Sequence, residues 1–586
     1  MTESIKLKTD CRKPIATFIM TNIDWLVLVI TLGGIVGFGL WKGRLSSQNI
    51  EGYLLADRQM PWYHVTLSVM ATQASAITFL SAPGQAYTDG MRFVQFYFGL
   101  PLAMIVLSIT FIPMFKKMNV FTAYEFLEGR FDLKTRVLSS LLFLLPRALS
   151  TGVTIAAPSI ILSAILGWNL YWTNILTGTI VTIYCMFGGS KTISYTQLQQ
   201  MFVVLIGMFL AGYMVVHLLP TEMGFVDTLK VAGKMGKLNV IDWKFDLTNR
   251  YNVWSGLIGG FFLQLSYFGT DQSQVGRYLS GESVGESRLG LLMNGIFKIP
   301  MQFLILLVGA LVFVFYQFHQ APLFFNQTEL QKVEQMVEYQ KITEKNTIVF
   351  SQKKIAVESM FTAMQAHDEV AVDAQKVKVL EADKQANDLR TQVKDLIKKT
   401  DKSADVNDTN YIFLSFVTKY LPRGMVGLLI AVILLASMGS MASAFSSLTS
   451  STIVDIYQRI IHPIDTEQHF LNASKISTLC WGIFCIIVAE FTANIGSLIE
   501  AVNILGSWFY GTILGVFLVA FYFKSIKSNA VFWAAIIAEG IVIYAWWIDL
   551  TAFLWLNLIG CVAVIVIGFL LQMFQNKVED ITPLKP

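Results

Sequence analysis

A row of hydroxyl side chains runs through one apolar segment of the sequence. The stretch ASMGSMASAFSSLTSS, residues 436–451, holds seven serines and one threonine and continues directly from the apolar run RGMVGLLIAVILL. Five serines recur at steps of three and four residues, so one helical face would carry Ser437, Ser440, Ser443, Ser447 and Ser451. Neutral oxygens of this kind can hold a hard cation such as sodium without a permanent buried charge. Serines also bond back to their own helix or allow close helix packing, and both alternatives stay open.

Two further apolar segments are interrupted by small and polar residues. SVMATQASAITFLSAPG covers residues 68–84, and FFLQLSYFGTDQSQVGR covers residues 261–277. Backbone that unwinds within a membrane is tolerated where it lines a cavity, and there it can bind an ion or a solute. Close packing of small residues is the alternative. One weakened helix early and one in mid-chain is the pattern expected of an inverted repeat with a midplane site.

Two basic residues, Lys298 in NGIFKIPMQFLILLVG and Arg147 in LLFLLPRALSTGV, lie within apolar runs. Ionisable groups at such positions face a cavity or a charged partner, or else they snorkel to the membrane interface.

The composition is typical of a membrane protein. Hydrophobic residues make up 54% of the 586 residues and charged residues 14%, and the mean hydropathy is +0.55. A soluble domain carries about 25% charged residues. The net charge of +4 gives no indication of nucleic-acid binding. The five cysteines show no disulfide or metal spacing, and no metal-ligand cluster or nucleophile–base pair is recognisable, so we do not expect an enzyme.

Apolar runs of about 20 residues, the length that spans a bilayer, recur along the chain. The first, IDWLVLVITLGGIVGFGLW, is too long for a signal peptide and lacks a small-residue cleavage site, so we expect a retained helix. The sequence predicts an all-α polytopic membrane protein with about 13 transmembrane helices. They lie near residues 24–43, 62–84, 93–116, 136–165, 169–187, 196–220, 252–275, 286–317, 423–455, 474–492, 497–523, 530–547 and 553–573.

Basic residues gather in one set of short loops, which indicates the cytoplasmic side. This set comprises Arg44, Arg58, Lys116, Lys117, Arg130, Lys134, Arg136, Lys191, Arg277, Arg288, Arg459, Lys524 and Lys527. The opposite short loops hold little beyond Arg92. We therefore expect a multi-pass protein of the plasma or inner membrane with its N-terminus outside and its C-terminus in the cytoplasm. The basic N-terminal tail favours the reverse orientation, but the loop set is larger and consistent.

Residues 318–422 break the pattern. They are polar and rich in Lys, Glu, Gln and Ala, as in DEVAVDAQKVKVLEADKQANDLRTQVKDLIKK, which favours exposed helices. We expect a solvated helical hairpin outside the membrane, with a partner-binding role as the alternative. The predicted organisation is a tail (1–23), eight helices (24–317), this insert (318–422), five helices (423–573) and a cytoplasmic tail (574–586).

Several motifs together resemble the sodium/solute symporter family, whose members include sodium–glucose, sialic acid, monocarboxylate and proline transporters. EGYLLADRQMPWYHVTLSVMAT resembles the entry to the first core helix, GGSKTISYTQLQQ the Gly-Gly signature, GTDQSQVGRYLS the Gln-Arg segment and SSTIVDIYQR the Asp-Ile-Tyr helix end. The resemblance spans nearly the whole chain outside the insert. It implies a leucine-transporter-type five-plus-five inverted repeat, preceded by one helix and followed by two, whose broken helices are the two interrupted segments.

The resemblance also implies a sodium site. Its ligands fall on Ala71, Ala74, Ala436, Gly439 and Ser440, with backbone carbonyls at the alanines and a hydroxyl at Ser440. Many members have a serine where this chain has Gly439, so one ligand is missing or replaced. The signature's aspartate, which serves an additional cation site in some members, is Gln197 here. A neutral amide cannot supply that charge, so we expect one sodium ion per cycle.

Sugar-type members place polar side chains at Gln73, Ser150, Gln264, Tyr267, Lys298 and Asn503 of this chain, and sialic-acid-type members suggest Ser75, Thr78 and Gln95 as well. The resemblance therefore implies a sodium-coupled symporter that imports a small polar organic solute, sugar or sialic-acid-like, by alternating access. A monocarboxylate or other anion symporter is one alternative. A transporter-like sensor that binds solute without moving it is another, although no output domain follows the last predicted helix.

Overall fold

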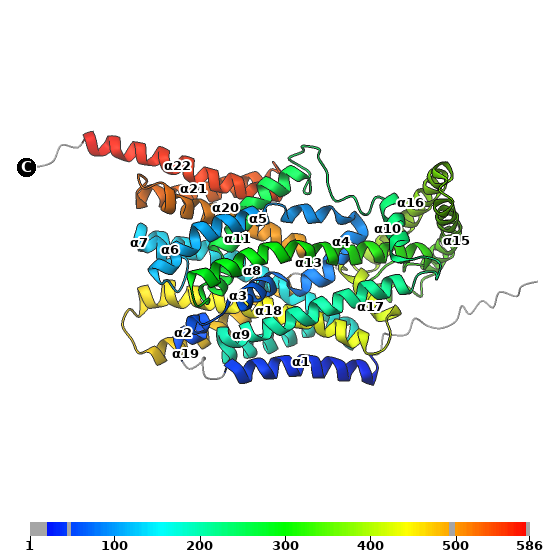
Figure 1. Cartoon of the computed structure of the whole chain (residues 1–586), viewed down its shortest axis with the longest axis horizontal. Helices are drawn as coiled ribbons and strands as arrows, with labels where there is room; N and C mark the ends of the chain where they lie inside the picture. The colour runs from blue at the N-terminus through cyan, green and yellow to red at the C-terminus, as the bar shows by residue number, and fades with distance from the viewer. Residues whose placement is uncertain (1–19, 44–48, 403, 492–497, 582–586) are drawn as a thin grey trace, which may run out of the picture.

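The computed structural model describes residues 20–43, 49–402, 404–491 and 498–581 (Figure 1). Within these ranges the regular elements are helices, apart from one β-bridge between Met60 and Gly281. Ten helical segments are long and apolar enough to cross a membrane, and the number rises to 11 if one bent pair counts as a span. The structure therefore confirms a polytopic all-helical chain, and the finer count of thirteen stays a prediction.

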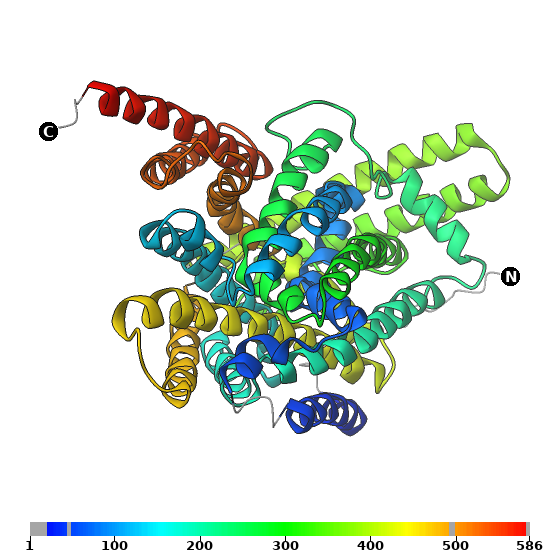
Figure 2. The ribbon, with the colours of Figure 1, turned by 60° about the vertical axis from the view of Figure 1, so that its left-hand side comes forward.

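The long helices run roughly side by side along the long axis of the molecule (Figure 1). Outside the interrupted segments, the helices of the bundle are α1 (Asn22–Gly43), the consecutive pair α5 (Leu100–Ile109) and α6 (Phe111–Met118), α8 (Leu133–Leu166), α9 (Leu170–His217), α13 (Val284–Phe318), α18 (Met425–Ser450), α19 (Glu467–Glu490), α20 (Leu498–Tyr522), α21 (Ser528–Trp547) and α22 (Phe553–Ile581). In both ribbon views, α1 and α22 lie on opposite sides of the bundle (Figures 1 and 2). The last helix continues beyond its predicted end at 573, into the segment expected to be a tail.

Helix α9 is 48 residues long and breaks at Gly189, whose φ of 63° lies in the left-handed region that favours glycine. Unbroken, a helix of this length would extend about 72 Å, more than twice the roughly 30 Å of bilayer hydrocarbon. The break divides α9 into two arms, near the two separate helices predicted there.

The first interrupted segment forms two helices, α3 (Trp62–Gln73) and α4 (Ala76–Asp89), which meet at an angle of 59°. At the break, the Ser75 amide donates to the Gln73 carbonyl rather than continuing the helical pattern (3.1 Å). The pair lies in the middle of the bundle, where α3 packs against α9, α13 and α18 (Figure 2). The prediction of a broken central helix is confirmed here.

The second interrupted segment comprises η4 (Ser255–Gly259), α11 (Gly260–Thr270) and α12 (Gln272–Leu279). Asp271 separates α11 from α12 with an extended backbone (φ −76°, ψ 115°). Its carboxylate caps α12 by accepting from the Ser273 amide (2.8 Å). An aspartate therefore ends one helix and starts the next inside the bundle.

The insert lies at one end of the molecule (Figure 1). It holds α14 (Gln327–Leu330), the hairpin of α15 (Val337–Gln365) and α16 (Glu369–Thr400), η5 (Thr409–Tyr411) and α17 (Ile412–Tyr420). Buried residues seven apart on α16, such as Val372 and Val379, face α15 in the manner of a coiled coil. Arg390 of the hairpin pairs with the buried Asp408 (2.9 Å), immediately before the η5 helix that packs on α4.

The basic loops meet one another at the opposite end. Arg58 donates to the Val120 carbonyl (2.9 Å), Lys116 to the Leu279 carbonyl (3.0 Å) and Arg130 to the Lys524 carbonyl (3.1 Å). These contacts therefore join loops that are far apart in sequence, and two other members of the basic set, Arg136 and Arg277, are buried. Arg44 lies outside the described residues.

The contact between α4 and the insert can be tested at Gly84. A Cβ added there would overlap the Thr409 carbonyl of η5, whereas a Cβ at Gly540 of α21 meets nothing within 4 Å. We expect Gly84→Ala to lower the free energy of unfolding by about 1–3 kcal/mol through overpacking. Gly540→Ala should leave it unchanged or slightly raised. Thermal unfolding of both variants in detergent measures the difference, and equal midpoints would contradict this contact.

Candidate functional site

A cavity of about 90 Å³ lies where both broken helices meet α8 and α20. Its apolar wall includes Phe96, Leu263 and Val502, and its polar lining comes from four separate stretches of the chain. Six residues that the sequence predicts for the substrate site line this one cavity. They are Gln73, Ser75, Thr78, Gln264, Tyr267 and Asn503.

Several polar atoms of this lining have no hydrogen-bond partner among the described residues. They include both side-chain polar atoms of Gln264 and the Oε1 atom of Gln73. Gln264 is only 1% exposed. Leaving a buried amide unpaired costs free energy, of the order of 1–3 kcal/mol for each group. These amides are therefore free to hydrogen-bond a polar ligand.

A buried ion pair joins the cavity to the second helix break. Arg147 of α8 lines the cavity, and its guanidinium lies 3.5 Å from the Asp271 carboxylate. The Tyr510 hydroxyl donates to the same carboxylate (2.9 Å), and the Tyr510 ring lies 5.8 Å from the Tyr267 ring. Gln274 in turn donates to the Tyr267 hydroxyl (2.8 Å). The Arg147 guanidinium therefore faces the cavity, and its ion pair with the Asp271 carboxylate holds it in this orientation.

Gln95 and Ser150, two other predicted substrate residues, are not among the residues lining the cavity. Gln95 donates to the Tyr251 carbonyl (3.0 Å) and accepts from the Asp242 amide (3.1 Å), so its amide fastens a loop beside η3 (Met91–Tyr97). Ser150 donates to the Arg147 carbonyl in its own helix (3.1 Å). Both side chains are satisfied by protein groups, which accounts for their absence from the cavity.

Lys298 is also absent from the lining. Its ammonium is fully buried and lies 6.0 Å from the ring centroid of Tyr97, which does line the cavity. No described residue hydrogen-bonds to this ammonium. Lys298 therefore lies one layer behind the cavity wall, while Arg147 presents its charge to the cavity directly.

The predicted sodium ligands lie where the broken end of α3 meets α18. All five are buried, and Ala74 is the residue at which α3 ends. Because the helix stops there, the Ser75 amide does not bond to the Ala71 carbonyl. The Ser440 hydroxyl donates to the Ser437 carbonyl (3.1 Å), and the hydroxyls of Ser447 and Ser450 likewise donate to carbonyls of their own helix. One member of the stripe crosses to α3, since the hydroxyls of Ser443 and Thr72 lie 2.9 Å apart.

Gln197 fills the space beside these groups. Its amide nitrogen donates to the Ser443 hydroxyl (2.8 Å) and the Gly439 carbonyl (2.9 Å), and its oxygen accepts from the Ser68 hydroxyl (2.5 Å). A Cβ at position 439 would overlap Gln200 and come within 3.4 Å of Gln197. The two departures noted in the sequence, Gln197 and Gly439, are therefore parts of one packing arrangement.

Sequence reasoning missed Asp271 and Tyr510. Asp271 could have been found, because an aspartate inside an apolar segment of a membrane protein is expected to have a partner or a function. Tyr510 lies in an unremarkable aromatic stretch, GSWFYG, and its role depends on how α20 packs against α11. No local signal in the sequence distinguishes it.

Comparisons with known proteins agree with this architecture. The model of the sodium:solute symporter family matches residues 53–342 and 396–538, so the stretch it leaves out lies within the α15–α16 hairpin. The human sodium/iodide cotransporter is 31% identical over 300 residues, which is 50% of this chain and 45% of that protein. The human sodium-coupled monocarboxylate transporter 1 is 29% identical over 287 residues, 49% of this chain and 46% of that protein. The chain spans about half the length of these curated relatives in the matches.

A solved structure shares the fold over almost the whole chain. It is the substrate-bound outward-open state of a Na+-coupled sialic acid symporter, with a TM-score of 0.73 and 19% identity. The match covers 94% of this chain and 98% of that one. Because the family model matches most of the chain, the chain belongs to the sodium:solute symporter family.

Proposed function

We propose that this protein is a sodium-coupled secondary active symporter, not an enzyme, and that it imports a small organic anion. The observation that carries the proposal is the polar cavity at the meeting of two helix breaks. Its lining combines unpaired amides of Gln73 and Gln264 with the guanidinium of Arg147. Solute sites of transporters are expected near the midplane, between discontinuous helices.

The architecture that we propose has thirteen crossings with a five-plus-five inverted repeat. Within the described ranges, ten helices are long and apolar enough to count as spans by themselves. Three more crossings are added when α9 is counted as two arms and when the broken helices α3–α4 and α11–α12 are counted as one crossing each. The repeat would run from α3 to α20, with α1 before it and α21 and α22 after it. The position of a break early in each half of this core supports the assignment.

Sodium would bind between the end of α3 and α18. We assign the carbonyls of Ala71, Ala74 and Ala436 and the hydroxyl of Ser440 as its ligands, beside Gly439. The break at Ala74 supports this, because it withdraws the Ser75 amide from the Ala71 carbonyl. A bound ion would fasten α3 to α18 and shape the cavity at Gln73 and Ser75. Sodium and solute would then stabilise the same state, which is the condition for coupling.

We expect one sodium ion per cycle, because Gln197 supplies a neutral amide, which donates to the Gly439 carbonyl and the Ser443 hydroxyl, where a second ion would need a negative charge. Replacing the amide by a carboxylate should create a second cation site. In Gln197→Asp, the sodium dependence of uptake should become sigmoidal, with a Hill coefficient above the value of about one expected for one ion. Gln197→Asn, which keeps a neutral amide, is the control. A wild-type protein with two coupled sodium ions would contradict this prediction.

The guanidinium in the cavity favours an anionic solute. Arg147 can bind a carboxylate with two parallel hydrogen bonds, and Lys298 lies behind the wall. A volume of about 90 Å³ is far below the roughly 300–1,000 Å³ of drug-sized sites, which favours a small carboxylate. A sugar or sialic-acid-like solute is the second candidate, favoured by the amides of Gln73, Gln264 and Asn503 and by the hydroxyls of Ser75 and Thr78. A sialic-acid-like solute also carries a carboxylate that Arg147 could bind.

The protein would lie in the plasma or inner membrane with the insert outside. The gathering of the basic loops at the opposite end supports a cytoplasmic location for that end. The N-terminus would then be outside and the C-terminus in the cytoplasm. The hairpin of α15 and α16 is the surface on which an extracytoplasmic partner would act, and its exposed Ile348 and Val377 would be available to that partner.

The test is solute binding to the purified protein with sodium or potassium present. A panel of short monocarboxylates, sialic acid and glucose would be compared by scintillation proximity or calorimetry. We expect a small carboxylate to bind in sodium only, and Gln264→Leu to weaken it at least tenfold because one amide is lost. Tight binding of glucose with no carboxylate binding would favour the second candidate. Binding unaffected by sodium would contradict the proposal.

A further inference from the structure

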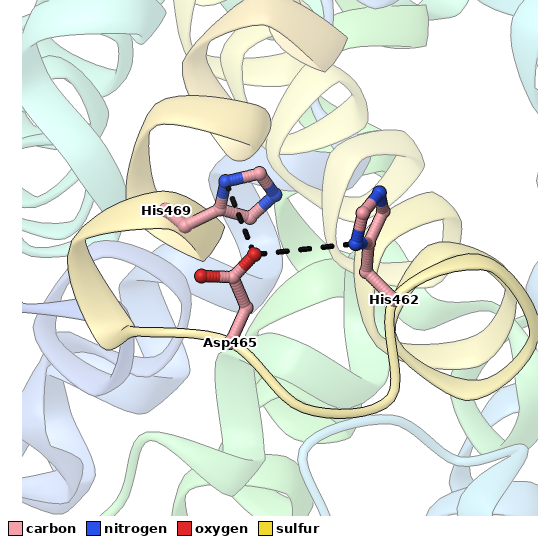
Figure 3. Close-up of side chains that lie close together, drawn as sticks. All are labelled: His462, Asp465 and His469. Atoms are coloured by element: carbon pink, nitrogen blue, oxygen red, sulfur yellow. Dashed lines mark ion pairs between the residues drawn. The ribbon is translucent and has the colours of Figure 1, made fainter.

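A cluster of two imidazoles and one carboxylate lies at the end of the molecule opposite the insert. His462, Asp465 and His469 place one ligand atom each within 4.8 Å of one another (Figure 3). The Asp465 Oδ2 atom is 3.4 Å from His469 Nδ1 and 4.0 Å from His462 Nδ1. Sequence inspection had shown no metal-ligand cluster, because these residues come from a short turn, HPIDTEQH, without a familiar spacing.

The local fold directs these three side chains toward one point. The π-helix η6 (Ser451–Ile461) ends just before His462, and the Thr466 side chain caps α19 by accepting from the His469 amide. The other carboxylate oxygen of Asp465 accepts from the Thr466 amide (2.7 Å), which leaves Oδ2 facing the imidazoles. The turn therefore holds all three groups on one side, where they remain partly exposed to solvent.

Tyr457 orients one imidazole from behind. Its hydroxyl lies 2.9 Å from His469 Nε2, and the two rings stack at 5.9 Å. In the tautomer whose Nε2–H donates a hydrogen bond to the Tyr457 hydroxyl, Nδ1 presents its lone pair toward Asp465 and His462. A metal-binding histidine is commonly fixed in this way by a second group on its other nitrogen.

We propose that His462, Asp465 and His469 bind a divalent transition-metal ion, with Zn²⁺ as the best fit and water as the fourth ligand. Imidazole and carboxylate suit this ion, whose bonds to them are about 2.0–2.2 Å long. Tetrahedral geometry then places ligand atoms roughly 3.4 Å apart. The His469–Asp465 separation already has that value, the His462–Asp465 separation is 4.0 Å, and all three ligand atoms lie within 4.8 Å of one another, so a small movement of the His462 side chain would close the site.

The ion would clamp two helices that belong to the transport machinery. The turn connects η6, which continues α18, to α19, and Glu467 in it accepts from the Ile50 amide at the start of α2 (Ile50–Leu55). Bound metal would hold these elements in one arrangement and slow any step that separates them. This consequence rests on the proposed transport function, whereas metal binding itself does not.

Metal binding is tested on the untagged full-length protein in detergent. Calorimetry with Zn²⁺ and the visible absorption of bound Co²⁺ should show that one metal ion binds per protein molecule. His469→Ala and Asp465→Asn should each lower the affinity for the ion at least 100-fold. Tyr457→Phe should weaken binding about 10–100-fold. The neighbouring Gln468→Ala is the control and should bind normally. If the wild type binds no metal, or if His469→Ala binds it equally well, these three residues are not a metal site and form only an ordinary cluster of surface side chains.

The clamp is tested separately by uptake into proteoliposomes with and without Zn²⁺ on the side of this turn. We expect Zn²⁺ to slow uptake at least twofold in the wild type and not in Asp465→Asn. Metal binding with no change in uptake would overturn the clamp while leaving the site in place. A protein that binds Zn²⁺ but transports nothing would count against the proposed function instead.

Discussion

Arg147→Ala should lower the uptake of a carboxylate solute by about 30-fold or more. The guanidinium lines the cavity and is the one positive charge that the described lining presents to it. Truncating one member of a buried, hydrogen-bonded charge pair costs about 2–5 kcal/mol, and each 1.4 kcal/mol is tenfold in affinity. Initial uptake rates of the variant and wild type in proteoliposomes measure the effect.

Two further variants separate binding from folding. Arg147→Ala leaves the Asp271 carboxylate buried without its cation, which by itself destabilises the fold. In Arg147→Ala/Asp271→Asn the buried charge is removed while an amide oxygen still caps α12, so thermal stability should recover while uptake stays lost. Arg147→Lys should keep the charge but weaken transport, because an ammonium cannot make the two parallel bonds. Full uptake by the double variant would contradict the role of Arg147.

Arg136→Ala should lower the free energy of unfolding by about 3–5 kcal/mol, the cost of breaking a buried ion pair. Arg136 lies 2.8 Å from the Asp455 carboxylate, whose side chain is fully buried. It also pairs with Glu128 (2.6 Å) and donates to the Val454 carbonyl (3.0 Å). Removing it leaves the Asp455 carboxylate with the hydrogen bond from the Thr122 hydroxyl (2.6 Å) but without its cation. Chemical unfolding in detergent measures the change.

Arg459→Ala is the matched control, because Arg459 pairs with the same Glu128 but is 49% exposed. Burial raises the pKa of Glu128, but hydrogen bonds from Arg459 and Arg136 outweigh that effect and hold its pKa below the usual value. An exposed pair is worth about 0–1 kcal/mol, so the loss should be small. Equal effects of the two variants would contradict the importance of the buried pair.

The helix breaks were predictable because hydropathy records them directly. Small and polar residues inside apolar runs indicated where α3 and α11 end. Six of the side chains predicted from these segments and their neighbours line one cavity. Which polar residues face the cavity depends on the rotation of each helix and on its neighbours. Gln95 is bound by the Asp242 loop and Lys298 lies behind Tyr97, and neither fact can be read from local sequence.

The departures at Gln197 and Gly439 show a second limit. Each was visible in the sequence as a single change, one removing a charge and the other a hydroxyl. The structure shows that they belong together, because the Gln197 amide bonds to the Gly439 carbonyl and a side chain at 439 would crowd the glutamines. Paired changes of this kind require the two helices to be placed side by side.

The most direct test of sodium-coupled symport is accumulation of a small carboxylate in proteoliposomes above its outside concentration under an inward sodium gradient. Ser440→Ala should abolish the accumulation, whereas Ser447→Ala, whose hydroxyl also bonds within α18 (2.7 Å), should retain it. We predict that accumulation in the wild type collapses when an ionophore dissipates the gradient. Uptake that only equilibrates, or that continues unchanged without the gradient, would contradict coupling to sodium.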